Sequence, residues 1–549
     1  HTIDNTFCKL KRSKLLYIFT PLLFMAGIAI GILIGGGFRK GGSSTVELSD
    51  KYRELLGLIN SEYVDDVDID SLLEMNIPDL LSYLDPHSAY IPASDFEDVN
   101  SELEGSFSGV GISFQIIKDT VVAVDIIAGG PAQKVGLQPG DRILSADTVQ
   151  LTGAGATQEK VFSNLRGDKG SHVKLKILRP GMSKPAVYDI VRGDIPVNSV
   201  DSYYMLDRKT GYIRVGKFAK NTYQEFLDAL VKLRMQGADK MVIDLRGNSG
   251  GYMDQAILMA NEFLPGGRRI VYTKGRKKTD DVIADSDGRG SFQNMQLVVV
   301  ADEFSASASE IFAGAIQDND RGLVIGRRTF GKGLVQNQFM LPDNSALRLT
   351  IARYYTPSGR SIQKEYVRGE GGKYEMDILE RYNRGEFYSA DSIHLDKSRR
   401  YRTHNGRIVY GGGGIMPDIF IPEDTAGVTS YYTEVVNRGL IPRFSMQLAD
   451  RYRRAMGNSR DMDKLLRSLP NDNALLQQFA DFASGEGVPA RWYYIGRSRA
   501  LLLRQIKAVL VRDILGFNAY FKIINRDDAM IQRALRELNA GHSPIQIKK

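Results

Sequence analysis

The first strong pattern along the chain is an apolar run over residues 15–38, with no charged side chain between Lys14 and Arg39. As a helix it would be about 36 Å long, against roughly 30 Å for a bilayer core. Basic residues precede it within residues 1–14, which predicts a cytoplasmic tail followed by a transmembrane anchor. A cleaved signal peptide is the alternative, although its apolar run is usually only about 7–15 residues long.

The hydrophobic periodicity changes after this run. Residues 46–100 carry leucines at helical spacing and predict a helical N-terminal region. Residues 101–193 instead carry short β-like runs between Gly- and Pro-containing turns, with one short helix expected near Ala132. The β-like runs are residues 110–117, 121–126, 173–178 and 187–191. A small β-rich module is therefore expected after the helical region.

Strands alternate with helices over residues 194–422, a pattern typical of an α/β core with parallel strands. The expected strands are residues 211–215, 241–245, 296–301 and 322–326. Residues 367–412 are polar without a clear period and are expected to be an irregular insertion. Residues 425–549 again show helical spacing and predict a helical C-terminal region.

Composition and charge exclude several classes of protein. The 549 residues are 43% hydrophobic and 25% charged, as in ordinary globular proteins, and the net charge of +7 is small for this length. No basic stripe interleaved with aromatic residues suggests nucleic-acid binding. Cys8 is the only cysteine, so an intramolecular disulfide is impossible. No metal-binding histidine spacing occurs, and neither a metal nor a nucleotide cofactor is expected.

Ser307 and Lys332 carry the most informative chemistry. Ser307 stands in a run of small residues, and Lys332 lies between two glycines in an apolar stretch. A serine can attack a carbonyl when a neighbouring neutral amine takes its proton. A free lysine has a pKa of about 10.4, so Lys332 would have to be neutralised by burial to act as that base. Gln336 could hold the amine by a hydrogen bond, whereas a surface lysine in a glycine turn is the alternative.

The residues around Ser307 also match the start of a helix. Glu310 follows Ser307 by three positions, which is the capping-box pattern and would by itself explain the serine without catalysis. Unpaired N–H groups at such a helix start could also stabilise a developing oxyanion. Ala308 is the first expected donor, and Gly250 or Gly251 could supply a second.

Ser249 is a rival nucleophile. It lies in a G-x-S-x-G pattern between an expected strand and an expected helix, as in Ser–His–Asp hydrolases. That scheme needs a histidine later in the chain, and the candidates are His394, His404 and His542. His87 lies in a distinctive Pro-containing turn for which a structural role is expected.

A series of short motifs resembles the carboxyl-terminal processing proteases, the tail-specific serine endopeptidases of peptidase family S41. The resemblance covers roughly residues 46–422, and Ser249 departs from it because the family usually has proline there. The motifs are Leu84-Asp85-Pro86-His87-Ser88, Gly109-Val110-Gly111-Ile112, Gly136-Leu137-Gln138-Pro139-Gly140-Asp141, Leu165-Arg166-Gly167-Asp168-Lys169-Gly170, Asp244-Leu245-Arg246-Gly247-Asn248-Ser249-Gly250-Gly251, Ser305-Ala306-Ser307-Ala308-Ser309-Glu310-Ile311, Thr329-Phe330-Gly331-Lys332-Gly333 and Gly414-Ile415-Met416-Pro417-Asp418.

The resemblance implies a ClpP/crotonase-like α/β protease core over residues 194–422, preceded by a PDZ domain over residues 101–193. Its spacing selects Ser307, Lys332 and Gln336 as the catalytic residues. It implies protein C-termini as ligands. Together with the anchor expected at residues 15–38, it predicts a single-pass enzyme of the inner membrane with its catalytic body in the periplasm. A homo-oligomer or an adaptor protein is a further candidate partner. A non-catalytic PDZ scaffold that retained the protease fold is the alternative.

The PDZ expectation names its own binding residues. A peptide would add as a strand, and a loop of free N–H groups would hold its terminal carboxylate. Those residues are Gly109, Val110, Gly111 and Ile112, and the side-chain pocket could be lined by Ile112, Phe114, Val135 and Leu137. The resemblance also suggests that Arg166 couples this domain to the active site.

Overall fold

The computed structural model describes residues 43–117, 119–127, 129–457 and 459–542. Residues 1–14 and the expected anchor at 15–38 lie outside these ranges. By its internal contacts the chain divides into two units, residues 1–80 and 81–549. The first unit contains helices α2 (Ser43–Glu62) and most of α3 (Ile69–Ser82). No helix within the described ranges is long and apolar enough to cross a membrane.

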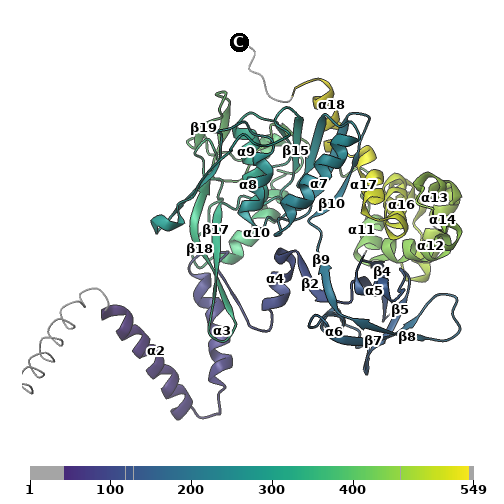
Figure 1. The fold of residues 1–549 in the computed structure, drawn as a ribbon, viewed down its shortest axis with the longest axis horizontal. Helices are drawn as coiled ribbons and strands as arrows, with labels where there is room; N and C mark the ends of the chain where they lie inside the picture. The colour runs from purple at the N-terminus through teal and green to yellow at the C-terminus, as the bar shows by residue number, and fades with distance from the viewer. Residues whose placement is uncertain (1–42, 118, 128, 458, 543–549) are drawn as a thin grey trace, which may run out of the picture. The chain divides into compact units, whose positions relative to one another are not determined.

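The centre of the second unit is a six-stranded sheet in the order β10-β11-β12-β15-β16-β21, of which Figure 1 labels β10 and β15. β10 and β11 pair antiparallel, and every later pair is parallel, as the strand–helix alternation predicts. The strands are β10 (Val200–Met205), β11 (Thr210–Val215), β12 (Lys240–Asp244), β15 (Gln296–Ala301), β16 (Leu323–Gly326) and β21 (Ile419–Phe420).

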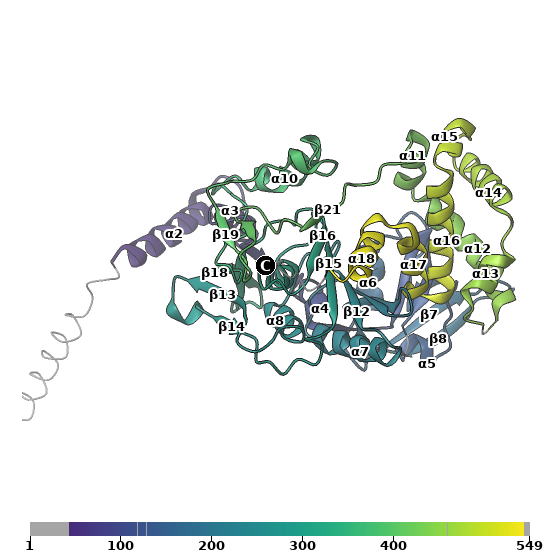
Figure 2. The same ribbon diagram turned by 90° about the horizontal axis from the view of Figure 1, so that it is seen from above.

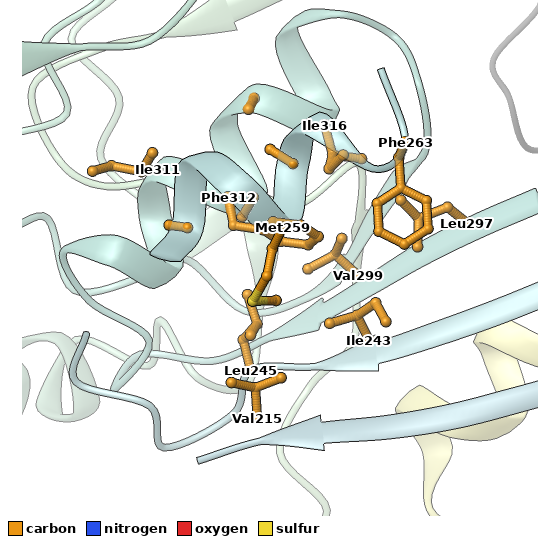
Figure 3. Packing of buried hydrophobic residues seen from close by; sticks show 14 of the residues in the cluster. Val215, Ile243, Leu245, Met259, Phe263, Leu297, Val299, Ile311, Phe312 and Ile316 are labelled. Carbon is orange, nitrogen blue, oxygen red and sulfur yellow. The ribbon is translucent and has the colours of Figure 1, made fainter. Parts of the chain in front are cut away.

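Both faces of this sheet are buried, which explains why its strands read as continuous apolar runs. Ile243, Leu245 and Val299 point to one face and pack against helices α7 (Thr222–Met235), α8 (Met253–Asn261) and α9 (Ala308–Asp318) (Figure 3). The intervening side chains pack on the other face against α17 (Phe517–Ile524) and α18 (Ala529–Asn539), which Figure 2 shows in yellow. The end of the chain therefore completes the α/β core.

A second, antiparallel sheet lies beside the core. Its order is β1-β18-β13-β14, and β17 also pairs with β18. The strands are β1 (Ala89–Ile91), β13 (Arg269–Gly275), β14 (Ile283–Asp285), β17 (Leu334–Met340) and β18 (Ala346–Tyr355), and a short 3-10 turn, η1 (Lys278–Asp280), follows β13. Lys332 thus lies in the loop that leaves the parallel sheet after β16 and enters the antiparallel one at β17.

The β-rich module has one helix more than the sequence predicts. The missed helix is α6, which Thr157 caps by accepting a hydrogen bond from the Lys160 N–H at 3.2 Å. Helix α4 (Phe96–Glu104) leads into the module, whose elements are β2 (Ser106–Gly109), β3 (Ile112–Ile117), β4 (Thr120–Ile126), α5 (Pro131–Lys134), β5 (Arg142–Ala146), β6 (Val149–Gln150), α6 (Gln158–Leu165), β7 (His172–Leu178), β8 (Ala186–Val191) and β9 (Gly193–Pro196). β3 ends one edge of the main sheet, and β2 pairs with β9.

The helical C-terminal region is confirmed and has its own core. Phe444, Phe479 and Leu510 are among its buried side chains. Its helices are α11 (Ser430–Asn437), α12 (Leu440–Met456), α13 (Met462–Ser468), α14 (Asp472–Gly485), α15 (Trp492–Arg497) and α16 (Arg499–Leu515), and the 3-10 turn η3 (Asn525–Asp527) separates α17 from α18.

The expectation of an irregular segment at residues 367–412 is wrong in part. The segment contains α10 (Gly371–Asn383), the 3-10 turn η2 (Ala390–Ser392), and the hairpin of β19 (Arg400–Arg402) and β20 (Ile408–Tyr410). The buried residues of α10 are Tyr374 and Arg381. A helix whose buried side is polar and aromatic leaves no aliphatic period to detect.

Candidate active site

Ser307 lies at the carboxyl edge of the parallel sheet, in the loop between β15 and α9. Ligand and substrate sites of open α/β sheets form at this edge. Ser307 has φ 55° and ψ −114°, a backbone conformation that is strained for a residue with a side chain. Such a conformation persists only where the surrounding contacts hold it.

The glycine turn after β12 packs directly against Ser307. A Cβ atom on Gly250 would lie 2.6 Å from the Cβ of Ser307, and Gly250 has φ 106°. The buried Asn248 fixes the approach, because its carbonyl accepts the Ala306 N–H and the Ser309 hydroxyl, both at 2.9 Å. Its side-chain amide donates to the Val215 carbonyl of β11 at 2.9 Å. The two loops at the strand ends therefore form one unit.

One of the three expected oxyanion donors is already bonded. The Gly250 N–H donates to Asn248 Oδ1 at 2.9 Å, so the expectation that Gly250 offers a free donor is contradicted in this conformation. Ala308 is the first residue of α9, where N–H groups have no partner within the helix. Within the described ranges the N–H groups of Ala308 and Gly251 have no hydrogen-bond partner.

Lys332 faces the same cleft from the loop between β16 and β17. Its amine donates to Gln336 Oε1 at 3.1 Å, as expected from the spacing, and Gln336 donates to the His87 carbonyl. Burial, and then the positive charge of Arg348, lowers the pKa of Lys332, against the opposing effect of Glu310 and Asp85. The amine is therefore easier to neutralise than a free lysine.

Glu310 joins the Ser307 loop to the Lys332 loop, a role that the sequence did not suggest beyond a helix cap. Its carboxylate is completely buried and accepts four hydrogen bonds. The donors are the N–H groups of Ser307 at 2.9 Å, Gly331 at 2.8 Å and Lys332 at 2.8 Å, and the hydroxyl of Thr329. Burial raises the pKa of Glu310 to about 7, while these donors favour its charged form.

A tyrosine adds a second connection between the two loops. The hydroxyl of Tyr354, on β18, lies within hydrogen-bond distance of the Ser307 carbonyl, at 3.1 Å, and of the Lys332 carbonyl. The Tyr354 ring is 1% exposed, so it is held by the core and cannot swing away without a rearrangement. Nothing in the sequence around Tyr354 distinguishes it from other strand tyrosines.

The His87 turn supports this arrangement from behind. The Asp85 carboxylate accepts the N–H groups of His87 and Ser88 at 2.9 Å each, and the Thr350 hydroxyl of β18 at 3.0 Å. Burial, and then the charge of Lys332, lowers the pKa of His87 to about 4. The neutral ring contacts the Tyr374 hydroxyl at 2.9 Å, in line with the structural role expected for it.

Ser249 and the later histidines do not come together. Ser249 lines the cleft beside Ser307, but within the described residues no histidine bonds to it. His394 bonds to the Ser392 carbonyl, His404 to Arg268, and His542 to Glu537. No group of metal-binding side chains occurs among the described residues either.

The cleft that holds these groups has a volume of about 570 Å³. Ser307, Lys332 and Gln336 line it, together with Gly250 and Gly251. Within the described ranges no hydrogen bond joins the Ser307 hydroxyl to the Lys332 amine. Catalytic hydrogen bonds are often longer before substrate binds, so a shared cleft is the relevant geometry.

A second cavity, of about 790 Å³, lies along β3 and α6 of the β-rich module. Ile112 and Phe114 line it, as expected. The Val110 and Leu137 side chains are instead 2% and 4% exposed in the module's own core, and Val135 packs against that core. Val110 can therefore serve a ligand only through its backbone.

The glycines and the arginine of this module are also placed. Gly109 ends β2, and Gly111 has φ 80°. The Arg166 guanidinium lies over the Phe107 and Phe162 rings, 4.8 and 5.0 Å from their centres, and lines the cavity. A role of Arg166 in coupling this module to the cleft stays a prediction.

Comparisons with known proteins agree with this architecture. The sequence matches the profile of peptidase family S41 over residues 209–370, the PDZ domain over residues 108–187, and a family of unknown function, DUF8443, over residues 431–516.

Two curated relatives and one solved structure are similar to the chain. A carboxy-terminal-processing protease of Bartonella bacilliformis is 37% identical over 317 residues, covering 57% of this chain and 72% of the relative. A probable CtpA-like serine protease of Staphylococcus aureus is 32% identical over 330 residues, covering 60% of this chain and 64% of the relative. The solved photosystem II D1 C-terminal processing protease is 28% identical, covers 57% of this chain and 89% of that chain, and has a TM-score of 0.32. The chain therefore belongs to the carboxy-terminal-processing proteases of peptidase family S41 and is a serine protease with a PDZ domain.

Proposed function

We propose that this protein is an endopeptidase that captures the C-termini of other proteins through its PDZ domain and cleaves their peptide bonds with Ser307 and Lys332. The observation that carries the proposal is the buried Glu310 carboxylate, which bonds to the backbone N–H groups of both residues at 2.8–2.9 Å. A serine hydroxyl and an amine of lowered pKa thereby face one cleft.

The chemistry follows from these groups. The Ser307 hydroxyl attacks the scissile carbonyl while the neutral Lys332 amine takes its proton. The N–H of Ala308 stabilises the oxyanion that forms, with Gly251 as the second donor. The proton then passes from Lys332 to the nitrogen of the scissile bond. The C–N bond breaks, the amine product departs, and the acyl group stays on Ser307 as an ester. Water attacks that ester, again with Lys332 as base, and releases the product acid and free Ser307.

Gln336 has a positioning role in this scheme. Its Oε1 atom accepts a hydrogen bond from the Lys332 amine at 3.1 Å, and its side-chain NH2 donates a hydrogen bond to the His87 carbonyl. The Lys332 side chain has several rotatable bonds, so a fixed acceptor removes conformations in which the amine points away from Ser307. The scaffold alternative, a PDZ adaptor without catalysis, gives no reason for this arrangement.

We further propose that the enzyme is held in the inner membrane with its catalytic body in the periplasm. The support is the uncharged run of residues 15–38 and the basic residues before it. Protease protection of the full chain in spheroplasts would test this, because a periplasmic body is digested by added protease and a cytoplasmic one is not.

The first prediction concerns the two catalytic groups. Ser307→Ala and Lys332→Ala should each lower kcat/KM for an unfolded protein substrate by at least about 10³-fold, because each removes an essential part of the acylation step. Peptide binding to the PDZ domain should persist in both variants. Mass spectrometry of the digest gives the cleavage rate, and full activity of either variant would contradict the mechanism and favour the scaffold alternative.

The second prediction concerns pH. The base works only when Lys332 is neutral, so kcat/KM should rise about tenfold per pH unit and level off above the pKa of Lys332, which burial lowers from the usual lysine range. Gln336→Glu puts a negative charge beside the amine and should shift this limb to higher pH. Asn337→Asp, with the same charge on the next residue of β17, should shift it less. A limb that stays in place in Gln336→Glu would exclude Lys332 as the titrating base.

The third prediction compares two glycines of one turn. Gly250→Ala places a methyl group against the Ser307 Cβ and should abolish cleavage. Gly247→Ala also introduces a side chain at positive φ, 71°, but its Cβ meets nothing closer than 3.7 Å. Gly247→Ala should lose about 1 kcal/mol of stability, since alanine disfavours this backbone region, and Gly250→Ala should lose more, because its methyl group also overlaps buried atoms. Equal activity of the two variants would show that Ser307 tolerates displacement.

The fourth prediction concerns Glu310. Glu310→Gln turns an amide NH2 toward N–H donors and should lower kcat/KM by about 100-fold, because Ser307 and Lys332 lose their common anchor. Glu225→Gln is the matched control, since Glu225 accepts two backbone N–H groups, from Ser199 and Val200, and none of these three residues lines the cleft. Activity is measured where circular dichroism shows both variants folded. Loss of activity in proportion to stability alone would exclude a positioning role.

A further inference from the structure

The cavity along the PDZ domain has a wall that the domain does not provide. Ile112 and Phe114 of β3 and Phe162 of α6 form its apolar side. Arg438 and Arg443, from the helical region over residues 431–516, also line it. Since β3 is the last strand of its sheet, its outer edge faces this cavity and can accept a further strand.

Helix α12 contacts the PDZ domain through an ion pair. Asp450 of α12 forms an ion pair with Arg142 of β5 at 2.8 Å. Asp450 follows Arg443 by two helical turns, so both lie on one side of α12, and Met446 between them is 6% exposed. Phe444 and Leu448, on the other side, pack in the core of the helical region. The position of Arg443 at the cavity is therefore set by packing in the helical region and by the Asp450–Arg142 ion pair.

The cavity wall is positively charged. Its lining includes Arg166, Arg438 and Arg443, and no aspartate or glutamate is among the described residues that line it. Glu434 contacts Arg438 at 3.2 Å and Glu486 contacts Arg443 at 2.6 Å, but neither carboxylate lines the cavity. The Arg443 Nε atom is buried without a hydrogen-bond partner. An arginine has five N–H donors, so Arg438 and Arg443 can each donate to a further carboxylate.

We propose that this composite cavity selects protein C-termini that carry an acidic side chain upstream of the terminal residue, and that Arg438 and Arg443 recognise that side chain. The inference rests on the proposed capture of C-termini by the PDZ domain. It assigns the helical region a function as the specificity wall of the peptide site. The extended peptide would pair with β3, and its acidic side chain would face α12.

Fluorescence anisotropy tests this in the Ser307→Ala background, where bound peptides are not cleaved. The probes are short peptides with one apolar C-terminus, in which a glutamate or a glutamine occupies each upstream position in turn. The best glutamate peptide should bind about fivefold more tightly than its glutamine counterpart, the size expected for a partly exposed ion pair. Arg438→Gln and Arg443→Gln should reduce this preference, and the double variant should abolish it without weakening the glutamine peptide.

Arg451→Gln is the matched control. Arg451 lies on α12, as Arg443 does, and it is exposed but does not line the cavity. It should keep the preference. Arg443→Gln also removes the Arg443–Glu486 ion pair, and this loss could unfold the helical region. In that case Arg438→Gln alone decides the question, because the Arg438 side chain is 51% exposed and its replacement should leave the fold intact. A preference that is absent in the parent, or unchanged in Arg438→Gln, would overturn the inference while leaving peptide capture intact. If no peptide binds, or if C-terminal amidation has no effect, the proposed capture itself fails.

Discussion

The geometry of the cleft depends on one buried carboxylate. Glu310 accepts N–H bonds from the backbones of both Ser307 and Lys332, so the two residues share an anchor although they stand on different loops. Burying a carboxylate is costly unless donors surround it, and four donors do so here. The same bonds help to hold Ser307 at a positive φ that it would otherwise avoid.

The sheet makes that anchor possible. β12 and β15 are parallel neighbours, so the loops that follow them emerge at one edge, and Asn248 bonds one loop to the other. Lys332 arrives from a different direction, on the way into the antiparallel sheet. Ser307, at the start of a helix, and Lys332, on a connection between strands, thus line one cleft although the two loops belong to different sheets. The hydroxyl of Tyr354, on the second sheet, lies within hydrogen-bond distance of the Ser307 and Lys332 carbonyls.

The sequence predicted the helices and strands whose apolar residues recur in a regular pattern along the chain. Strands buried on both faces appear as apolar runs, and the expected strand at residues 296–301 coincides with β15. The missed helix α10 has a polar buried side, so its period was hidden. Glu310 could be recognised only as a cap, because its other donors come from residues 329–332, which lie far away in sequence. The hydrogen bond from the Gly250 N–H to the Asn248 side chain could not be predicted either, because it depends on the conformation of the loop and not on the residue types.

The two sites of the protein are connected by a short and well-held segment. Helix α4 lines the catalytic cleft through Asn100 and Glu104, and β2 of the PDZ domain begins one residue after it ends. That one residue is Gly105, with φ 77°, where a Cβ would collide with Asn221 of the core. Leu103 and Gly105 also accept backbone bonds from the core and from the strand that returns from the PDZ domain. A rotation of the PDZ domain relative to the core must therefore move α4 at the cleft or break these bonds.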